Sequence, residues 1–217
     1  MMTTLNSRFV LGTILWGILS SFPTEGIAAP VTFSFTGVVS HVDAKLFPTV
    51  TAGQTLSGSY TFESGTALSR PGNRYNGAIT AFSANLGPYN AVLGAGTNFI
   101  AVANNRSFDR YALSAPLNPA PGAPGRAFRF HLELVDPSSG TFSNRALPMT
   151  PPSLSSFATT RWRLVFENEH GTARIRGVLT SLTAVPLPAA VLLFGAGLAA
   201  LAGLGAGSWR RRQNGLT

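Results

Sequence analysis

The stretch that decides the fold class is residues 128–134, Phe128-Arg129-Phe130-His131-Leu132-Glu133-Leu134, in which every second residue is apolar. A period of two places successive side chains on opposite faces of a β-strand, so one face of this segment is apolar and the other is polar. Residues 161–167 repeat the pattern. There the apolar residues are Trp162, Leu164 and Phe166, and they alternate with Arg161, Arg163 and Glu167. Both segments are expected to be strands whose apolar faces lie in a core.

Shorter runs with the same period occur earlier in the chain. Phe33 and Phe35 alternate with polar residues, as do Leu56, Gly58, Tyr60 and Phe62. Turn-forming residues separate the runs at 70–73, 87–90, 104–105, 136–140 and 168–171, while 116–125 and 146–156 are rich in proline and are expected to be loops. Strands joined by short turns form antiparallel sheets. We therefore expect one all-β domain, residues 29–184, folded as an antiparallel β-sandwich or jelly roll of roughly eight to ten strands.

The composition excludes several classes of site. The chain of 217 residues has no cysteine, which excludes disulfides, thiolate zinc sites, iron–sulfur clusters and cysteine nucleophiles. Its formal charge of +8 includes 12 basic and 7 acidic residues between positions 29 and 185, and the arginines there are spread singly or in alternating pairs. A nucleic-acid interface usually has a clustered basic stripe with aromatic residues between the charges. We therefore expect a mildly basic, solvated surface and no nucleic-acid partner.

Residues 1–28 have the three parts of a secretory signal peptide. Arg8 precedes the apolar stretch 9–19, which at 11 residues is about half the length needed to span a bilayer. Small residues follow at Gly26 and Ala28, the two positions that a signal peptidase reads. We expect cleavage between Ala28 and Ala29. The alternative is an uncleaved apolar N-terminus.

A second apolar segment, residues 187–207, contains no charged residue and as a transmembrane helix would be about 31 Å long, enough to cross a bilayer. Trp209 and the basic cluster Arg210, Arg211 and Arg212 follow it. Basic residues stay in the cytoplasm, so the domain is expected on the opposite side, with 213–217 as a cytoplasmic tail. Gly195, Ala199, Gly203 and Gly207 recur every four residues, and they either form a face for packing against another helix or reflect chance in a segment rich in Gly and Ala.

A short motif joins the domain to this segment. Val185-Pro186-Leu187-Pro188-Ala189, the apolar segment and the three arginines together resemble the VPLPA variant of the PEP-CTERM sorting signal, over residues 185–212. The resemblance implies that an exosortase, an inner-membrane processing enzyme of Gram-negative bacteria, acts on the chain on its way to the cell surface or exopolysaccharide matrix. Pro186 and Pro188 match the two prolines of the motif, whereas Leu187 stands where the namesake motif has Glu. Residues 33–37, 53–62 and 75–79 also resemble uncharacterised β-rich exported domains, a likeness that bears on the fold alone.

Each histidine has a carboxylate near it in the sequence. His131 and Glu133 share one face of their strand, as do His41 and Asp43, while Glu167, Glu169 and His170 lie together at a predicted hairpin tip. Pairs of this kind can bind a metal ion, but most of them are solvated surface pairs. We therefore expect no metal site at any of the three.

The sequence contains no motif of a known catalytic site. It has no nucleophile elbow, phosphate loop, dinucleotide fingerprint or zinc-protease motif. The carboxylates available to a glycoside hydrolase are Asp43, Glu63, Asp109, Glu133, Asp136, Glu167 and Glu169. Tyr75, Tyr89, Phe108 and Tyr111 lie in or beside turns, where aromatic rings can stack on sugars, although each is expected in the core. We expect no catalytic residue, no cofactor and no enzyme activity.

The sequence therefore predicts an exported structural or interaction protein. Its expected route is the inner membrane, with the domain on the periplasmic side, and then the cell surface or extracellular matrix. Signal peptidase and an exosortase-like enzyme are its expected partners, and the C-terminal helix is its contact with the membrane. One alternative is a lectin-like module that binds extracellular polysaccharide. Others are a permanently tail-anchored periplasmic protein and a hydrolase.

Overall fold

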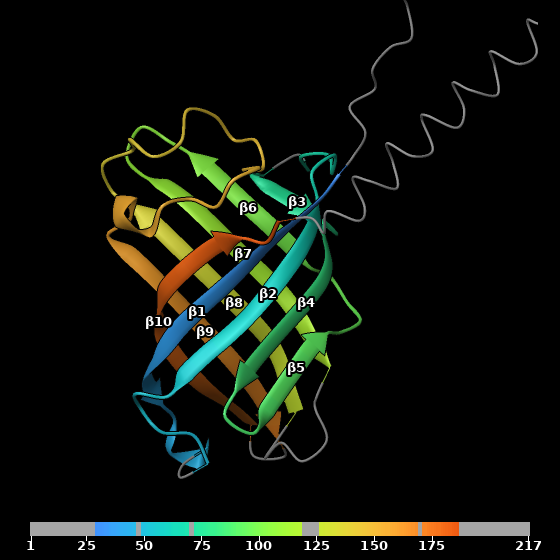
Figure 1. Ribbon diagram of the computed structural model, residues 1–217, viewed down its shortest axis with the longest axis vertical. Coiled ribbons are helices and arrows are strands. Elements are labelled where there is room, and N and C mark those ends of the chain that lie inside the picture. The colour runs from blue at the N-terminus through green and yellow to red at the C-terminus, as the bar shows by residue number, and fades with distance from the viewer. Residues whose placement is uncertain (1–28, 47–48, 70–71, 119–125, 169–170, 187–217) are drawn as a thin grey trace, which may run out of the picture.

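The computed structural model describes residues 29–46, 49–69, 72–118, 126–168 and 171–186, and these residues form strands, turns and two short 3₁₀ segments (Figure 1). The strands are β1 (Pro30–Val42), β2 (Thr55–Glu63), β3 (Arg74–Asn76), β4 (Ile79–Leu86), β5 (Tyr89–Leu93), β6 (Phe99–Asn104), β7 (Asp109–Asn118), β8 (Arg126–Asp136), β9 (Thr159–Asn168) and β10 (Gly171–Ala184). The 3₁₀ segments are η1 (Ala44–Leu46) and η2 (Leu154–Ser156). The predicted all-β class is confirmed.

The strands form a closed barrel rather than the predicted sandwich or jelly roll. Every pairing is antiparallel, and the order β7-β5-β4-β2-β1-β10-β9-β8 returns to β7 because β8 also pairs with β7. A sandwich would leave two sheets with separate edges, whereas here eight strands make one ring. Strands β6 and β3 extend the sheet from the side of β7, outside the ring order. The prediction of a sandwich is therefore wrong, because the sheet closes on itself as a barrel.

One edge of β7 is shared by two strands. Residues Asp109–Ser114 pair with β6, and Leu117 and Asn118 pair with β5, so the ring between β4 and β7 is closed by β5 over only two residue pairs. At the opposite end Asn98 bridges the gap between β6 and β4. Its side-chain oxygen accepts from Ile79 N and its side-chain nitrogen donates to Ile79 O, both at 3.0 Å. The Asn98 amide thus takes the place of a missing strand pairing.

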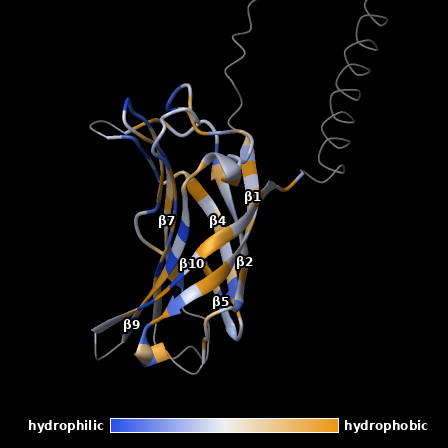
Figure 2. Cartoon of the chain, turned by 90° about the vertical axis from the view of Figure 1, so that its left-hand side faces the viewer, coloured by the Kyte–Doolittle hydropathy of each residue, from blue (hydrophilic) through white to orange (hydrophobic). Residues whose placement is uncertain are grey.

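Aromatic side chains fill the barrel. Alternating residues along each strand point inward, and Figure 2 shows hydrophobic and hydrophilic residues alternating along strands such as β10. Phe33, Phe35, Tyr60, Phe62, Phe82, Phe130 and Trp162 are all buried, and their ring centroids lie 5.0 to 6.4 Å apart in successive pairs. Rings at such separations gain packing energy beyond the area they bury. The interior is therefore a packed core.

Two glycines make room for the largest ring. Gly177 of β10 lies directly opposite Trp162 of β9, and Gly37 of β1, the next strand, also lies against the indole. A Cβ atom on either glycine would overlap the indole and a neighbouring backbone carbonyl. The Trp162 indole Nε1 donates to Val178 O at 3.3 Å. The absence of side chains at positions 37 and 177 is thus what allows Trp162 to lie inside the barrel.

The core also contains one pair of polar groups. The hydroxyls of Tyr60 and Tyr111 lie 2.9 Å apart, and neither side chain is more than 1% exposed. Burial raises the pKa of both hydroxyls, so both stay protonated in ordinary buffers. Each hydroxyl is the hydrogen-bond partner of the other, which satisfies the requirement that buried polar groups be paired.

The connection between β8 and β9, residues 137–158, covers one end of the barrel (Figure 1). Two buried carboxylates hold it. Asp136 accepts hydrogen bonds from Ser138, Gly140 and Thr141, while Asp109 accepts from the backbone N–H groups of Thr141 and Phe142 at 2.9 and 2.7 Å. These bonds lower the pKa of Asp136 below its usual range. The predicted turn at 136–140 is confirmed, and so is the absence of strands from 146–156.

Two other predictions fail for local reasons. Phe128 is 46% exposed, because Ala127 pairs with Phe166 and Arg129 with Val165, leaving Phe128 as the extra residue of a β-bulge. The predicted loop at 116–125 begins too early, since β7 continues through Asn118. Pro116 remains in the strand because its carbonyl accepts from Gly94 N at 2.9 Å.

Both ends of the described domain emerge together. β1 and β10 are antiparallel neighbours, with Phe33 opposite Ala184, so Ala29 and Val185 lie at the same end of the barrel (Figure 1). Ala29 N donates to Ser64 Oγ at 3.1 Å, and Val185 N donates to Thr32 O at 2.9 Å. These bonds join both ends of the domain to the hydrogen-bonded structure of the barrel.

The predicted signal peptide, residues 1–28, and the segment 187–217 lie outside the described residues, and so do Leu187, Pro188, Ala189, the predicted helix face and the basic cluster. In the part of the chain that the structure describes, no helix has the length and apolar character needed to cross a membrane.

Candidate functional site

The outer surface of β7 to β10 gathers half of the domain's basic residues. Of the arginines on these four strands, six have side chains that the structure describes, and we call the surface they form the arginine face: Arg110 on β7, Arg129 on β8, Arg161 and Arg163 on β9, and Arg174 and Arg176 on β10. Antiparallel register brings them together. Arg163 lies opposite Arg176 on one side and His131 on the other, while Arg161 lies opposite Glu133. The strand order thus produces a basic cluster from residues that are up to 66 positions apart in the numbering of the chain.

Glu133 is the acidic side chain inside this face. Its Oε1 lies 2.8 Å from Arg110 Nε, and its Oε2 accepts from Arg161 Nε at 2.6 Å and contacts Arg161 Nη2. The Glu133 side chain is 19% exposed, whereas Arg110 and Arg161 are 46% and 67% exposed. One carboxylate is therefore held between two guanidinium groups, a charge-assisted arrangement that arginine forms readily.

Three other arginines lack such a partner. Among the described residues, Arg163, Arg174 and Arg176 form no ion pair, and all three are exposed. Burial and the neighbouring positive charges of Arg174, Arg161 and Arg176 lower the pKa of Arg163, although Glu133 opposes this effect. Like charges directly opposite each other in a sheet are destabilising, so the pair Arg163 and Arg176 favours the binding of an anion.

His131 lies in the middle of the face and is uncharged at neutral pH. Desolvation, together with the positive charges of Arg163 and Arg129, lowers its pKa from an ordinary 6.5 to about 4. Glu133 acts in the opposite direction but does not compensate. The positive charge of the face at pH 7 therefore comes from its arginines.

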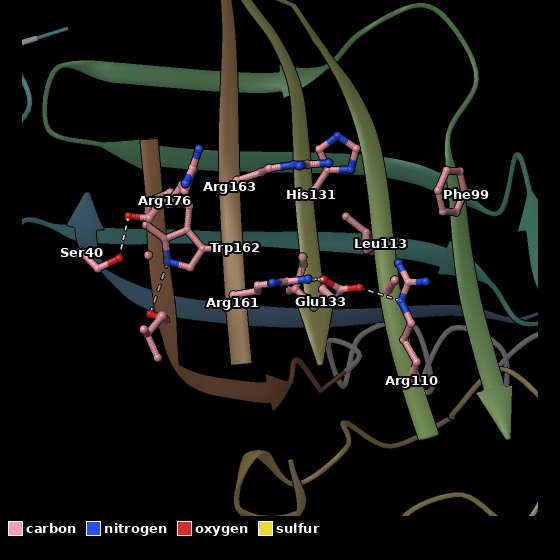
Figure 3. A pocket seen from close by; sticks show the side chains of 14 residues that line it. Ser40, Phe99, Arg110, Leu113, His131, Glu133, Arg161, Trp162, Arg163 and Arg176 are labelled. Carbon is pink, nitrogen blue, oxygen red and sulfur yellow. Dashed lines mark hydrogen bonds and ion pairs between the residues drawn. The ribbon is translucent and has the colours of Figure 1, made fainter. Parts of the chain in front are cut away.

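The face contains a groove of about 590 Å³ (Figure 3). Ala112 of β7 is among its lining residues, with Phe99 from β6 on one side and the side chains of β8 to β10 on the other. Figure 3 shows Arg176, Arg163 and His131 following one another across the strands, with Arg161, Glu133 and Arg110 beside them. The groove thus runs across the strands and exposes guanidinium groups along its length.

Aromatic rings at the border of the face are covered by arginines. The Arg74 guanidinium lies 4.4 Å from the centre of the Phe99 ring, and that of Arg129 lies 5.7 Å from the centre of the Phe128 ring. Arg129 also donates to Ser114 Oγ at 2.9 Å and to Thr97 O at 3.1 Å. These two hydrogen bonds hold the Arg129 side chain in place at the border of the face.

The other histidine and carboxylate candidates are dispersed. His41 Nε2, near the end of β1, lies 3.3 Å from Asp43 Oδ1, and Asp43 accepts from Arg174 N. Glu167 is exposed at the end of β9, and Glu169 and His170 lie outside the described residues. Asp109 and Asp136 are direct partners on β7 and β8, but both are buried under the 137–158 connection. Among the described residues no group of three or more His, Asp or Glu side chains is placed to hold a metal ion.

The aromatic candidates for sugar stacking are mostly in the core, as expected. Tyr75, Tyr89 and Tyr111 are buried, while Phe108 is 36% exposed in the turn before β7. The Tyr75 hydroxyl donates to Arg145 O at 2.6 Å, which ties β3 to the 137–158 connection. These tyrosines therefore stabilise the barrel.

Sequence reasoning found His131, Glu133 and the alternating arginines, but it did not find the face they form. One feature of the sequence could have indicated the face: each of the six arginines alternates with buried residues along its strand and so points outward. Their assembly also needs β7 to β10 to be consecutive neighbours, which depends on ring closure. Comparisons with protein-family models, curated proteins and solved structures find no match to this chain.

Proposed function

We propose that this chain is an exported interaction protein, sorted to the cell surface or extracellular matrix by exosortase-type processing of residues 185–212. Its role there is structural: the barrel is a compact module that presents a binding surface, and it has no catalytic function. Signal peptidase removes residues 1–28, and the apolar segment 187–207 holds the domain at the inner membrane before processing.

The observation that carries this proposal is the agreement between the barrel boundaries and the predicted processing sites. β1 begins at Pro30, one residue after the predicted mature end at Ala29. β10 ends at Ala184, and within the described residues the Val185 N–H is the last one bonded to the barrel, at Thr32 O. Cleavage at Ala28–Ala29 and near Pro188 would therefore leave all ten strands intact. A sorting signal that is removed must lie outside the folded domain in this way.

The packed interior supports an interaction role. The rings of the core fill the barrel, and the groove described above lies on the outer surface. Binding there would involve side chains on rigid strands, which favours recognition of a surface ligand over chemistry in an enclosed site. The alternative of a polysaccharide-binding module is favoured by the arginine face.

Intact mass of the chain, recovered separately from inner membrane and from extracellular matrix, tests the proposal in cells with and without the exosortase. We expect a matrix form that begins at Ala29, ends near Pro188 and disappears when the enzyme is absent. A variant with both Pro186 and Pro188 replaced by Ala should accumulate in the membrane, while the matched Pro151→Ala/Pro152→Ala variant should be sorted normally. Recovery of a full-length, membrane-bound form alone would contradict sorting and would favour a permanent anchor.

A further inference from the structure

We infer that the arginine face binds an acidic polysaccharide whose negative charges are carboxylates. This inference rests on the proposed function, since it names the partner of the exported interaction module. The ligand would lie in the groove across β7 to β10, with its carboxylates at Arg163 and Arg176, which line the groove, and at Arg174 beside it.

Positive charges outnumber negative charges on the arginine face. It contains six guanidinium groups and one carboxylate, Glu133, and His131 is neutral at pH 7. Glu167 and Asp43 lie at its edges, where Asp43 is already bonded to His41 and to the backbone of Arg174. The centre of the face therefore keeps an excess of positive charge that is complementary to a polyanion.

The spacing of the charges favours a polymer over a single small anion. Neighbouring strands lie about 4.8 Å apart, so four strands span about 14 Å. Arg163 and Arg176 are directly opposite, and Arg174 is two residues from Arg176 on the same face of β10. A chain with repeated charges can contact several of these groups at once, whereas one small anion can contact only two or three.

The chemistry of Glu133 indicates the kind of anion. Within the face itself, one carboxylate is bound by Arg110 on one side and by Arg161 on the other. Arginine forks match carboxylates in this way through paired N–H donors. Arg163 and Arg176 lie on β9 and β10, with Arg163 two residues along β9 from Arg161, and they have no such carboxylate among the described residues. A uronate carboxylate would bind Arg163 and Arg176 as Glu133 binds Arg110 and Arg161.

A nucleic acid fits the face less well. Single-stranded nucleic acids bind through bases stacked on open aromatic rings, with arginines along the backbone. The two rings that border the face, Phe99 and Phe128, are each faced by an arginine, Arg74 and Arg129. Hydroxyl-bearing sugars with carboxylates need no stacking platform, and Ser40, which lines the groove, adds a hydroxyl on the same surface.

The test measures binding of the full-length chain, in a non-ionic detergent at low salt and pH 7, to polygalacturonate. We expect Arg163→Gln/Arg176→Gln to weaken binding about tenfold, the change that two exposed ion pairs account for. The matched Arg106→Gln/Arg145→Gln variant loses the same charge from loops at the end of the barrel and should bind as the parent chain does. Arg163→Lys/Arg176→Lys keeps the charge but loses the paired donors, and it should weaken binding severalfold.

Two further ligands decide the chemical class. Fully methyl-esterified polygalacturonate has the same backbone without charge and should not bind. A single-stranded DNA oligomer at equal charge concentration should bind more weakly than polygalacturonate, and tighter binding to DNA would overturn the inference in favour of a nucleic acid. Equal binding by the Arg163/Arg176 and Arg106/Arg145 variants would overturn the assignment to this face.

Separate control measurements test whether each variant is folded and whether the chain is processed. Far-ultraviolet circular dichroism confirms that each variant is folded, and Arg174→Gln/Arg176→Gln on β10 gives a second variant of the same face with the same expected loss. A chain that binds polygalacturonate but is never processed would overturn the sorting proposal and leave this inference standing. A chain that is processed normally but does not bind would overturn this inference alone.

Discussion

Trp162 of β9 lies against Gly177 of β10, its direct partner across the ladder, and the indole leaves no room for a Cβ atom at position 177. A methyl group at position 177 would overlap both the indole and the carbonyl of Val38, so neither neighbour can make room by a simple rotation. Three strands, β1, β9 and β10, therefore depend on one glycine for their spacing.

The Gly177→Ala variant is expected to lower the free energy of unfolding by about 1–3 kcal/mol, the range for overpacking in a close-packed core. Urea unfolding followed by tryptophan fluorescence measures the change. Gly140→Ala is the control, because a Cβ there meets only Ser138 Oγ at 3.7 Å, and it should change stability by less than about 0.5 kcal/mol. Equal stability of the two variants would show that the indole adjusts freely.

The Tyr60 and Tyr111 hydroxyls are expected to be coupled. Tyr111→Phe leaves the Tyr60 hydroxyl buried without a partner, at a cost of about 1–2 kcal/mol in the free energy of unfolding. The double variant Tyr60→Phe/Tyr111→Phe removes both polar groups and should cost less than the sum of the two single variants. Denaturant unfolding of all four proteins measures the coupling, and additive losses would contradict it.

His131 is expected to make stability depend on pH in the acid range. Its pKa of about 4 lies below the ordinary 6.5, so between these values the unfolded chain binds a proton more readily than the folded one. The stability that the fold gains from a neutral His131 is therefore fully present above about pH 6.5. It is lost as the pH falls toward about 4. Free energies of unfolding measured across this range should fall for the parent chain.

The matched variants are His131→Gln and His41→Gln. His131→Gln removes the group beside Arg129, Arg163 and Glu133, and its stability should therefore fall less between pH 6.5 and 4 than that of the parent chain. His41→Gln leaves these neighbours in place and should fall as the parent does. An identical pH profile for His131→Gln and the parent chain would contradict the assignment.

Local patterns were sufficient to predict β1, β2, β8 and β9 and the core residues that these strands contribute. Phe33, Phe35, Leu164 and Phe166 are buried as their period of two predicts, because alternation is a property of the strand itself. Phe128 departs from the pattern because a bulge shifts the phase by one residue, and no feature of residues 128–134 marks that shift.

Closure of the sheet could not be predicted in the same way. A sandwich and a barrel have the same inward and outward alternation, and they differ only in whether β8 pairs with β7 and β5 with β7. The same long-range pairing creates the arginine face. Arg163 and Arg176 belong to neighbouring strands, but their separation from Arg110 and Arg129 in the chain hides the cluster until the strand order is known.

The course of β10 has a mechanical consequence. This strand holds Arg174 and Arg176 near its start and leads to Pro186 just beyond its end. A polymer attached at those arginines and a load on the chain at Pro186 would pull on opposite ends of a single strand. The covalent backbone of β10 would then bear the tension. The hydrogen bonds to β1 and β9 would hold the strand in the sheet without bearing that load themselves.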